Sequence, residues 1–465
     1  MKPIFTITLI LLLKTSFGQI LFNKSYSKQH DDLINAVIER YDGKYLIAGS
    51  SYSQFTTDFD VNIMLVDSVG NLIWDKYIGQ SPRMEFAYSL IETKDSNYVI
   101  SGKVASNDPY LLKFDSAGNF LWAKEYPTQL YSYGGRSVGQ TFDSNYYFIS
   151  HDTLSTLYLT NTLGDTIWTR KYESVILESV VQTSDSGFIM TGNSDPTLTN
   201  QDICLVKTNS NGNTLWTKTF GGGGFDRATC VQQLSDNGFI IVGNYDAQII
   251  DGDWQTYIIR TNSVGDTIWT QNHYLGESNY IAECKNNTGY ILSSKEYIPM
   301  MFPYPERYSL VITKLDTAGV REWSKRFDGY YYEFGNDIAQ TSDGGYLLTG
   351  YVDYGISFAD AVLIKLDSAG NFVLSVIDVS NSKTSHVLVF PNPAINEINF
   401  EIGDSKSNIK QLKVLNSLGQ EMLLIGNINE RQFKLDIKSL SVGLYFYQLI
   451  TSGNQIETGK FIVEE

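Results

Sequence analysis

Asp115-Ser116-Ala117-Gly118-Asn119-Phe120-Leu121-Trp122 is the stretch that decides the fold, because near-copies of it recur along the chain. The recurring glycines are spaced 46 to 54 residues apart. They are Gly70, Gly118, Gly164, Gly212, Gly265, Gly319 and Gly370. A period in this range is typical of repeat architectures, in which each repeat is one supersecondary unit.

Each copy predicts a tight turn between two strands. An apolar run leads into the turn at residues 111–114, and another follows it at residues 120–122. Asp115 opens the turn with a side chain that can bond its own backbone, and Gly118 adopts a left-handed conformation at no steric cost. The pattern therefore predicts a β-hairpin with a bulge. Six of the seven tryptophans stand four residues after the turn glycine: Trp74, Trp122, Trp168, Trp216, Trp269 and Trp323.

Two further signatures complete the repeat. One is a turn and an apolar strand that ends at a small residue, as in residues 42–49, 185–192, 236–243 and 343–350. The other lies between the tryptophan and this strand, as in residues 87–92, 228–233 and 337–340. Each repeat thus holds about four short strands and no helical period. The sequence predicts an all-β protein with a seven-bladed β-propeller over residues 19–378.

The two ends of the repeat region leave the closure of the propeller open. Residues 20–26 resemble the strand that begins with tryptophan, with Phe22 in its place, and residues 372–378 offer a similar strand. One end strand completes a blade begun by the other terminus, or the two build a partial eighth blade. Completion would remove open sheet edges.

Outside the repeats the sequence changes character. Residues 1–18 have a basic start, a short apolar core and small residues before Gln19, which predicts a signal peptide. Residue 19, directly after the expected cleavage site, is glutamine and not cysteine, which argues against a lipoprotein anchor. Residues 379–386 are polar and predict a linker. Residues 387–465 carry alternating runs typical of a small all-β domain, and we expect a β-sandwich.

Composition excludes several classes of function. The formal net charge of −16 makes nucleic acid and anionic membranes improbable partners. We find no apolar stretch of transmembrane length after the signal peptide. The three cysteines, Cys204, Cys230 and Cys284, are interpreted as buried small hydrophobes, with a pair involving Cys204 left open.

No catalytic, cofactor or metal motif is found. The four histidines never stand at metal-ligand spacing. Asp58, Asp60, Asp251 and Asp253 are interpreted as solvated loop charges and not as calcium ligands. We interpret the tryptophans as structural side chains that dock between neighbouring blades. A basic residue two positions after most of them, as at Lys76, Lys124, Arg170 and Lys218, indicates a solvated face or ion pairs between blades.

The tyrosines Tyr330, Tyr331 and Tyr332 are the best candidates for exposed aromatic contact with a glycan or protein ligand. Strand packing is the competing interpretation. The Asp, Gly and Trp of each turn resemble the tryptophan-docking repeats of quinoprotein-like propellers. The adjacent cysteine pair of many quinoprotein dehydrogenases is absent, so the resemblance implies the architecture alone.

The C-terminal region resembles the type A sorting domain of the type IX secretion system of Bacteroidetes. The matching residues, in order, are Pro391, Asn392 and Pro393, then Asn416, Gly419 and Gln420, then Gly443 and Tyr445, and finally Lys460. Asn416 stands where many members have an acidic residue. The resemblance implies export by the signal peptide, passage of the outer membrane through the secretion machinery, and removal of the tail in the linker. The protein is then attached to the cell surface or released.

Two functional classes follow. The favoured one is a non-enzymatic binding or adhesion module for a glycan or protein, without a cofactor. The other is a secreted glycosidase or lyase that uses the central face of the propeller. The favoured class is preferred because no set of acidic residues stands out from the repeat pattern.

Overall fold

The computed structural model describes most of the chain and shows it to be built from β-strands. The described residues are 21–26, 32–53, 58–79, 84–104, 108–128, 137–194, 201–222, 224–245, 255–273, 275–298, 307–327, 332–353, 359–371, 387–391, 394–402, 408–416, 421–451 and 456–463. Within these ranges the one helical element is a single 3₁₀ turn, η1 (Lys285–Asn287). The all-β prediction is confirmed. The predicted signal peptide, the end strand at 372–378 and the linker lie outside the described residues.

The repeat region forms four-stranded antiparallel sheets, which we number along the chain. Sheets 1 to 6 are meanders in which each strand pairs with the next one. Sheet 1 is β2 (Asp32–Glu39), β3 (Tyr45–Ser53), β4 (Asp58–Val66) and β5 (Leu72–Ile78); sheet 2 is β6 (Glu85–Glu92), β7 (Tyr98–Val104), β8 (Pro109–Phe114) and β9 (Phe120–Glu125); sheet 3 is β10 (Ser137–Gln140), β11 (Tyr146–His151), β12 (Ser155–Thr160) and β13 (Thr166–Tyr172); sheet 4 is β14 (Val175–Gln182), β15 (Phe188–Ser194), β16 (Ile203–Thr208) and β17 (Thr214–Phe220); sheet 5 is β18 (Arg227–Gln233), β19 (Phe239–Tyr245), β20 (Gln255–Thr261) and β21 (Thr267–His273); sheet 6 is β22 (Glu277–Glu283), β23 (Tyr290–Ile298), β24 (Arg307–Leu315) and β25 (Arg321–Phe327).

Sheet 7 combines the two ends of the repeat region. It contains β26 (Tyr332–Gln340), β27 (Tyr346–Asp353) and β28 (Asp360–Leu366), and β1 (Phe22–Tyr26) is its fourth strand. The N-terminal strand thus completes a sheet that the other end of the region begins, as one of the two closure hypotheses predicted. Pairing with β1 leaves β28 without an open edge.

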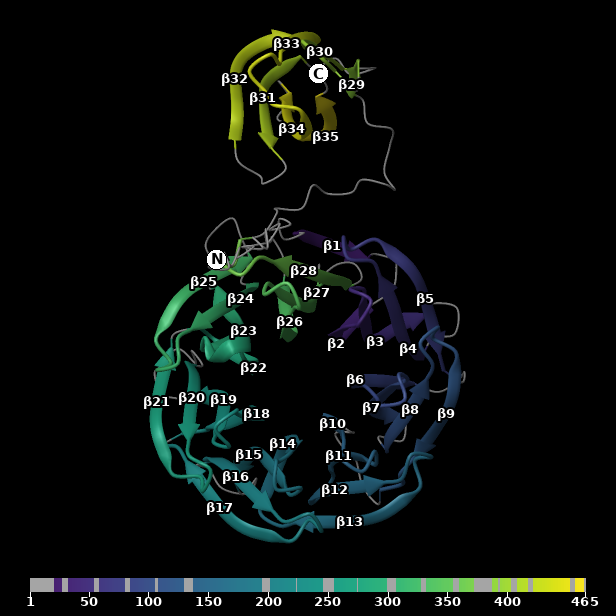
Figure 1. Cartoon of the computed structure of the whole chain (residues 1–465), viewed down its shortest axis with the longest axis vertical. Helices are drawn as coiled ribbons and strands as arrows, with labels where there is room; N and C mark the ends of the chain where they lie inside the picture. Colours follow the sequence, from purple (N-terminus) through teal and green to yellow (C-terminus); the bar gives the residue numbers. More distant parts are fainter. Residues whose placement is uncertain are drawn as a thin grey trace, which may run out of the picture. The chain divides into compact units, whose positions relative to one another are not determined.

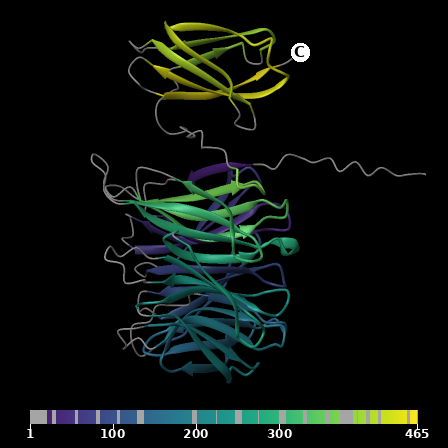
Figure 2. The ribbon, with the colours of Figure 1, turned by 90° about the vertical axis from the view of Figure 1, so that its left-hand side faces the viewer.

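Figure 1 shows sheets 1 to 7 following one another around a ring. The first strand of each sheet lies nearest the middle of the ring; these inner strands are β2, β6, β10, β14, β18, β22 and β26. The last strand of each of sheets 1 to 6 lies on the outside; these are β5, β9, β13, β17, β21 and β25. In the side view of Figure 2 the strands run across the thickness of the ring. Apolar clusters are shared between neighbouring sheets, as where Leu46 and Ile63 of sheet 1 join Ile100 and Leu112 of sheet 2.

The turn at residues 115–119 forms as predicted. The carboxylate of Asp115 accepts hydrogen bonds from the backbone N–H groups of Ala117 (2.9 Å) and Asn119 (2.8 Å). Gly118 has φ +76°, a left-handed conformation that suits glycine. The strand register shifts between Lys113 and Phe114, which confirms the predicted bulge.

The C-terminal region has two sheets of its own. One is β29 (Val387–Phe390), β30 (Glu397–Ile402) and β33 (Gln432–Asp436); the other is β32 (Glu421–Glu430), β31 (Ile409–Asn416), β34 (Gly443–Thr451) and β35 (Ile456–Val463). Both sheets contribute to one apolar core, which includes Phe400, Leu412, Leu449 and Phe461. The alternating apolar residues that predicted these strands therefore pack into this shared core.

Candidate binding site in the central cavity

A cavity of about 460 Å³ is lined by residues from the first strand of every sheet. We call it the central cavity. Because Figure 1 places these seven strands nearest the middle of the ring, each repeat supplies part of the same lining. A ligand there would contact several repeats at once.

A β-bulge positions one residue of each inner strand toward this cavity. In six of the seven inner strands the pairing with the next strand skips one residue. The skipped residues all line the cavity: Asn35, Tyr88, Glu178, Thr229, Asn279 and Asn336. In sheet 3 the described strand β10 begins one position after the equivalent place. A bulge leaves its extra residue out of the ladder and re-aims the side chain.

Several bulge side chains also connect one sheet to the next. The amide nitrogen of Asn35 donates to the Ala87 carbonyl (2.7 Å), and that of Asn336 donates to the Ile34 carbonyl (2.6 Å). The hydroxyl of Thr229 donates to the Ser278 carbonyl at 3.0 Å. In each case the acceptor is the residue before the bulge of the following sheet. These groups are thus held in fixed orientations, which is what a binding site needs.

The residue after the bulge forms a second layer of contacts. The backbone N–H of Val37 in sheet 1 donates to the Asp337 carboxylate in sheet 7 at 3.1 Å. Equivalent contacts join Val231 to Ser179 (3.3 Å) and Val180 to Ser137 (3.3 Å). Burial raises the pKa of Asp337 to about 6, although the backbone hydrogen bonds from Val37 and Ile338 favour its charged form. This carboxylate serves as a joint between sheets.

Glu178 is the one carboxylate among the six described bulge residues. Its side chain is 10% exposed, and its Oε1 lies 3.3 Å from a guanidinium nitrogen of Arg227. The other five bulge residues carry amide, hydroxyl or phenol groups. The described lining is therefore rich in uncharged hydrogen-bonding groups, and its carboxylates are those of Glu178 and Asp337. Such a lining suits a polar, largely uncharged ligand.

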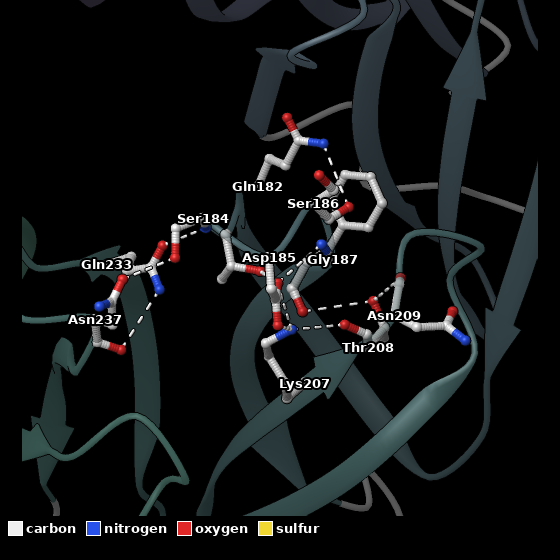
Figure 3. Close-up of polar contacts among 12 residues, drawn as sticks. Gln182, Ser184, Asp185, Ser186, Gly187, Lys207, Thr208, Asn209, Gln233 and Asn237 are labelled. Atoms are coloured by element: carbon white, nitrogen blue, oxygen red, sulfur yellow. Dashed lines mark hydrogen bonds and ion pairs between the residues drawn. The ribbon is translucent and has the colours of Figure 1, made fainter.

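A glutamine or glutamate ends each inner strand, and in six of the seven strands its side chain accepts a backbone N–H from the preceding sheet. Gln233 of sheet 5 accepts the backbone N–H of Ser184 in sheet 4 at 2.7 Å, and Figure 3 shows this contact. Between the first and last sheets, Glu39 accepts from the N–H of Ser342 at 2.6 Å. The remaining described pairs are Gln140 with Lys94, Gln182 with Phe142, Glu283 with Ser235 and Gln340 with Lys285. Sequence reasoning missed this set, although a Gln or Glu recurs four residues after each of the six bulge residues.

A second pattern that the sequence analysis missed is a buried cation beside the second-signature turn of sheets 2, 4, 5 and 7. Lys207 of β16 is 6% exposed and lies 2.9 Å from the Asp185 carboxylate, and its amine also donates to the Thr208 carbonyl (Figure 3). Burial alone would raise the pKa of Asp185, but hydrogen bonds from Thr183 and Lys207 hold that pKa below its ordinary value. Lys113 with Asp95 and Lys365 with Asp343 repeat the arrangement.

The tryptophans lie where neighbouring sheets meet. A Cβ atom added to a turn glycine would stand 2.7 to 2.9 Å from the ring of the tryptophan in the preceding sheet. The pairs are Trp74 with Gly118, Trp122 with Gly164, Trp168 with Gly212, Trp216 with Gly265, Trp269 with Gly319 and Trp323 with Gly370. All six rings are half-buried and not fully buried. Two of the basic residues that follow them form ion pairs with the next sheet, Lys124 with Asp165 and Lys218 with Asp266.

The other predicted site residues are spread over the chain. Tyr330 and Tyr331 lie outside the described residues, and Tyr332 begins β26, where the structure describes its backbone. Asp58 and Asp60 lie in strand β4, and Asp58 is 2% exposed, so the solvated-loop interpretation is wrong for Asp58. The three cysteines are buried, and none of them forms a disulfide bond.

Some predicted sorting residues fall in described strands. Pro391 follows β29 and Asn416 ends β31, while Gly443 opens β34 and Lys460 is exposed on β35. Tyr445 is 5% exposed, stacks on Phe461 and donates to the Ser441 carbonyl at 2.8 Å. Asn392, Pro393, Gly419 and Gln420 lie outside the described residues.

Two classes of site were also sought within the described ranges. No group of three or more histidine, cysteine, aspartate or glutamate side chains there is arranged to hold a metal ion. No helix in those ranges has the length and apolar character needed to cross a membrane.

Comparison with known proteins identifies the C-terminal region. Residues 388–464 match the family model of the secretion system C-terminal sorting domain. The chain carries a type IX sorting domain. This confirms the sorting-domain prediction made from the motifs, and the domain supports export by the type IX secretion system. The sorting domain also implies interaction with that machinery.

The remaining comparisons concern the whole chain. No curated protein matches it. Among solved structures, it is similar to a protein of unknown function from Bacteroides caccae, with 12% identity and a TM-score of 0.40 over 64% of this chain and 94% of the other. It is also similar to Sqt1 of Chaetomium thermophilum, with 10% identity and a TM-score of 0.47 over 74% of this chain and 97% of the other.

Proposed function

We propose that residues 19–378 form a seven-bladed β-propeller that is delivered to the outside of a Bacteroidetes cell. In this proposal the signal peptide at 1–18 is cleaved, and residues 387–465 fold as a β-sandwich that engages the secretion machinery. The tail is then removed in the linker at 379–386, and the propeller stays on the cell surface or is released. The sorting domain and the ring of four-stranded sheets support this account.

The exported propeller binds a polar, uncharged ligand, a glycan or a segment of a protein, in the central cavity. The observation that carries this proposal is the set of bulge residues that line the cavity, five of which are uncharged hydrogen-bonding groups. Tyr88 adds an aromatic ring to them, and sugars commonly stack on such rings. Tyr330, Tyr331 and Tyr332 precede and open the innermost strand of sheet 7 and are proposed as further ligand contacts.

A glycan array probed with residues 19–465 tests the binding proposal. Tyr88→Ala should lower binding of the best glycan by at least tenfold. The matched control is Tyr41→Ala, because Tyr41 is 84% exposed in a turn outside the cavity. Equal binding by both variants, or no binding to any glycan or to extracellular proteins of the host surface, would contradict a ligand site in the cavity.

A secreted glycosidase or lyase remains the second candidate because Glu178, a carboxylate that lines the cavity, is paired with Arg227. Glycosidases use two carboxyl groups, about 5–5.5 Å apart in retaining enzymes and about 6.5–9.5 Å apart in inverting ones. The binding proposal predicts that a panel of polysaccharide substrates shows no turnover. Turnover that disappears in Glu178→Gln, with glycan affinity retained, would establish the enzyme in its place.

Truncation after Ser385 tests the sorting role in a host that has a type IX system. We expect the truncated protein to accumulate inside the outer membrane, while the full chain reaches the surface or the medium. Protease accessibility in intact cells distinguishes the two locations. If the truncated protein reaches the surface as efficiently as the full chain, the export account is wrong.

A further inference from the structure

A groove between sheets 1 and 2 differs from the other described boundaries of the ring. It has a volume of about 840 Å³ and lies between strand β5 and the outer part of sheet 2. We call it the β5 groove. Its apolar wall includes Ile78, Leu112 and Phe120, and its rim carries Asp75 and Glu125.

The groove exists because an aromatic side chain is replaced. At three other boundaries, the residue four positions after the tryptophan reaches the carbonyl of the next turn glycine. The hydroxyl of Tyr126 donates to Gly164 at 2.7 Å, and that of Tyr172 donates to Gly212 at 2.8 Å. At the boundary of sheets 5 and 6, His273 Nε2 lies 3.1 Å from the Gly319 carbonyl oxygen. At sheets 1 and 2 the equivalent residue is Ile78, which has no polar group to reach Gly118.

The surrounding side chains enlarge the space. At the boundary of sheets 2 and 3, the ring of Tyr126 packs against Phe148 at 4.8 Å and Tyr158 at 5.6 Å between centroids. The strand registers place Ile100 and Leu112 at the equivalent positions in sheet 2. The boundary of sheets 2 and 3 thus has three aromatic rings, those of Tyr126, Phe148 and Tyr158. The boundary of sheets 1 and 2 has aliphatic side chains in their places, those of Ile78, Ile100 and Leu112. Leu112, Ile78 and Gly118 all line the β5 groove.

A buried hydroxyl also lines the groove. Tyr110 is 3% exposed, and within the described part of the chain its hydroxyl has no hydrogen-bond partner. Buried polar groups in native proteins nearly always have a partner, so an unpartnered one requires an explanation. A ligand in the groove would supply that partner.

We propose that the β5 groove binds a small phenol, whose ring occupies the space that a tyrosine fills at the boundaries of sheets 2–3 and 3–4. The ligand hydroxyl donates to the Gly118 carbonyl, as Tyr126 does to Gly164. The Tyr110 hydroxyl, which lies toward the other end of strand β8, donates to a second oxygen on ligands that carry one, such as a peptide carbonyl. The groove carries Asp75, Glu85 and Glu125 against Lys76, so it favours neutral or cationic phenols and disfavours those with a carboxylate. This site is separate from the central cavity, and the inference does not rest on the proposed function.

Calorimetric titration of the mature chain, residues 19–465, with five probes tests the chemistry of the site. We expect p-cresol and tyramine to bind with one-to-one stoichiometry. Toluene, which lacks the hydroxyl, should bind at least tenfold more weakly than p-cresol, and p-hydroxybenzoate should bind more weakly than both phenols. Tyrosine N-acetyl amide distinguishes a free phenol from a tyrosine side chain of a protein. Absence of p-cresol binding, or equal affinity for toluene, overturns the proposal.

Two matched variants test the location. Ile78→Tyr restores the residue found in sheets 2 and 3, and it should abolish p-cresol binding while raising the melting temperature. Tyr126→Ile removes the equivalent tyrosine between sheets 2 and 3, and it should raise the stoichiometry toward two. If Ile78→Tyr does not fold, Ile78→Phe gives a second measurement, because Phe220 and Phe327 occupy the equivalent position in sheets 4 and 6. It fills the same space and should also abolish p-cresol binding. Unchanged p-cresol binding in either Ile78 variant contradicts the assignment.

Discussion

The ring of Trp74 occupies the space beside Gly118 that any side chain at that position would enter. A Cβ atom on Gly118 would stand 2.7 Å from Cη2 of Trp74, and the φ of this glycine is +76°. A residue other than glycine would therefore carry both backbone strain and a steric conflict. The same relationship recurs at each described tryptophan, so the turn and the joint between sheets are specified by one glycine.

Alanine substitutions at Gly118 and at a control glycine separate the backbone strain from the steric conflict with Trp74. Gly118→Ala should lower the free energy of unfolding by about 2–4 kcal/mol, since left-handed strain of about 1–2 kcal/mol adds to displacement of the indole ring. Gly43→Ala is the control, because Gly43 has φ +73° and open space around it. Urea denaturation should show a smaller loss for the control. Equal losses would mean that the contact with Trp74 contributes nothing.

Removal of an indole ring tests the docking role of the tryptophans. Trp122→Ala should cost about 3 kcal/mol, toward the lower end for a large aromatic truncation because the ring is half-buried. Phe120→Ala, two residues earlier and 55% exposed, should cost less than about 1 kcal/mol. Thermal and urea unfolding measure both variants. A Trp122→Ala protein as stable as its parent would show that the ring is dispensable.

The buried carboxylate of Asp337 predicts a pH dependence of stability. Its folded pKa of about 6 lies above the ordinary value of 3.8, so the folded state binds the proton more tightly than the unfolded chain. The contribution of Asp337 to stability is therefore largest below pH 4 and is lost as pH rises through 6. Asp337→Asn keeps an oxygen for Val37 and removes the charge.

Denaturation at several pH values measures this effect. The stability of Asp337→Asn relative to the parent should rise between pH 4 and pH 7, by on the order of 1–3 kcal/mol. The difference should level off above pH 7. Two stability curves that stay parallel from pH 4 to pH 8 would contradict the raised pKa.

The buried lysine shown in Figure 3 provides a further contrast between two ion pairs. Lys207→Met should cost about 1–2 kcal/mol, because it removes hydrogen bonds to Asp185 and to the Thr208 carbonyl from a buried position. The partner Asp185 is 58% exposed, so water can replace part of the loss. Lys218→Met breaks an exposed pair with Asp266 and should cost less than about 0.5 kcal/mol. Indistinguishable stabilities would show that burial of the lysine has no effect.

The turns and their sheets could be predicted from the sequence because their chemistry is local. Asp115 and Gly118 specify a turn within four residues, and repetition of the turn predicts the repetition of the sheet. The closure by β1 was one of two hypotheses, since the repeat pattern treats both end strands alike. The sorting domain was predicted from motifs that span the whole of its length.

The central cavity could not be predicted in the same way. Asn35 and Glu178 face it because a bulge shifts the strand register, and that shift depends on the pairing of two strands and not on either strand alone. Ile78 is visible in the sequence as an exception to an aromatic position. The sequence alone does not show that this position meets the Gly118 turn of the next sheet, so the groove could not be predicted from it.

The joint between the first and last sheets constrains how this protein can be exported. Its hydrogen bonds connect residues 300 positions apart, such as Val37 and Asp337, whereas each sheet forms mainly from neighbouring hairpins. The cost of closing so long a loop grows only with the logarithm of its length, but such contacts form slowly. We therefore expect the sheets to remain an open arc, with two unmatched apolar faces, until residues 22–366 are all in the same compartment. A chain threaded gradually across a membrane would present those faces to chaperones and to other chains during transit.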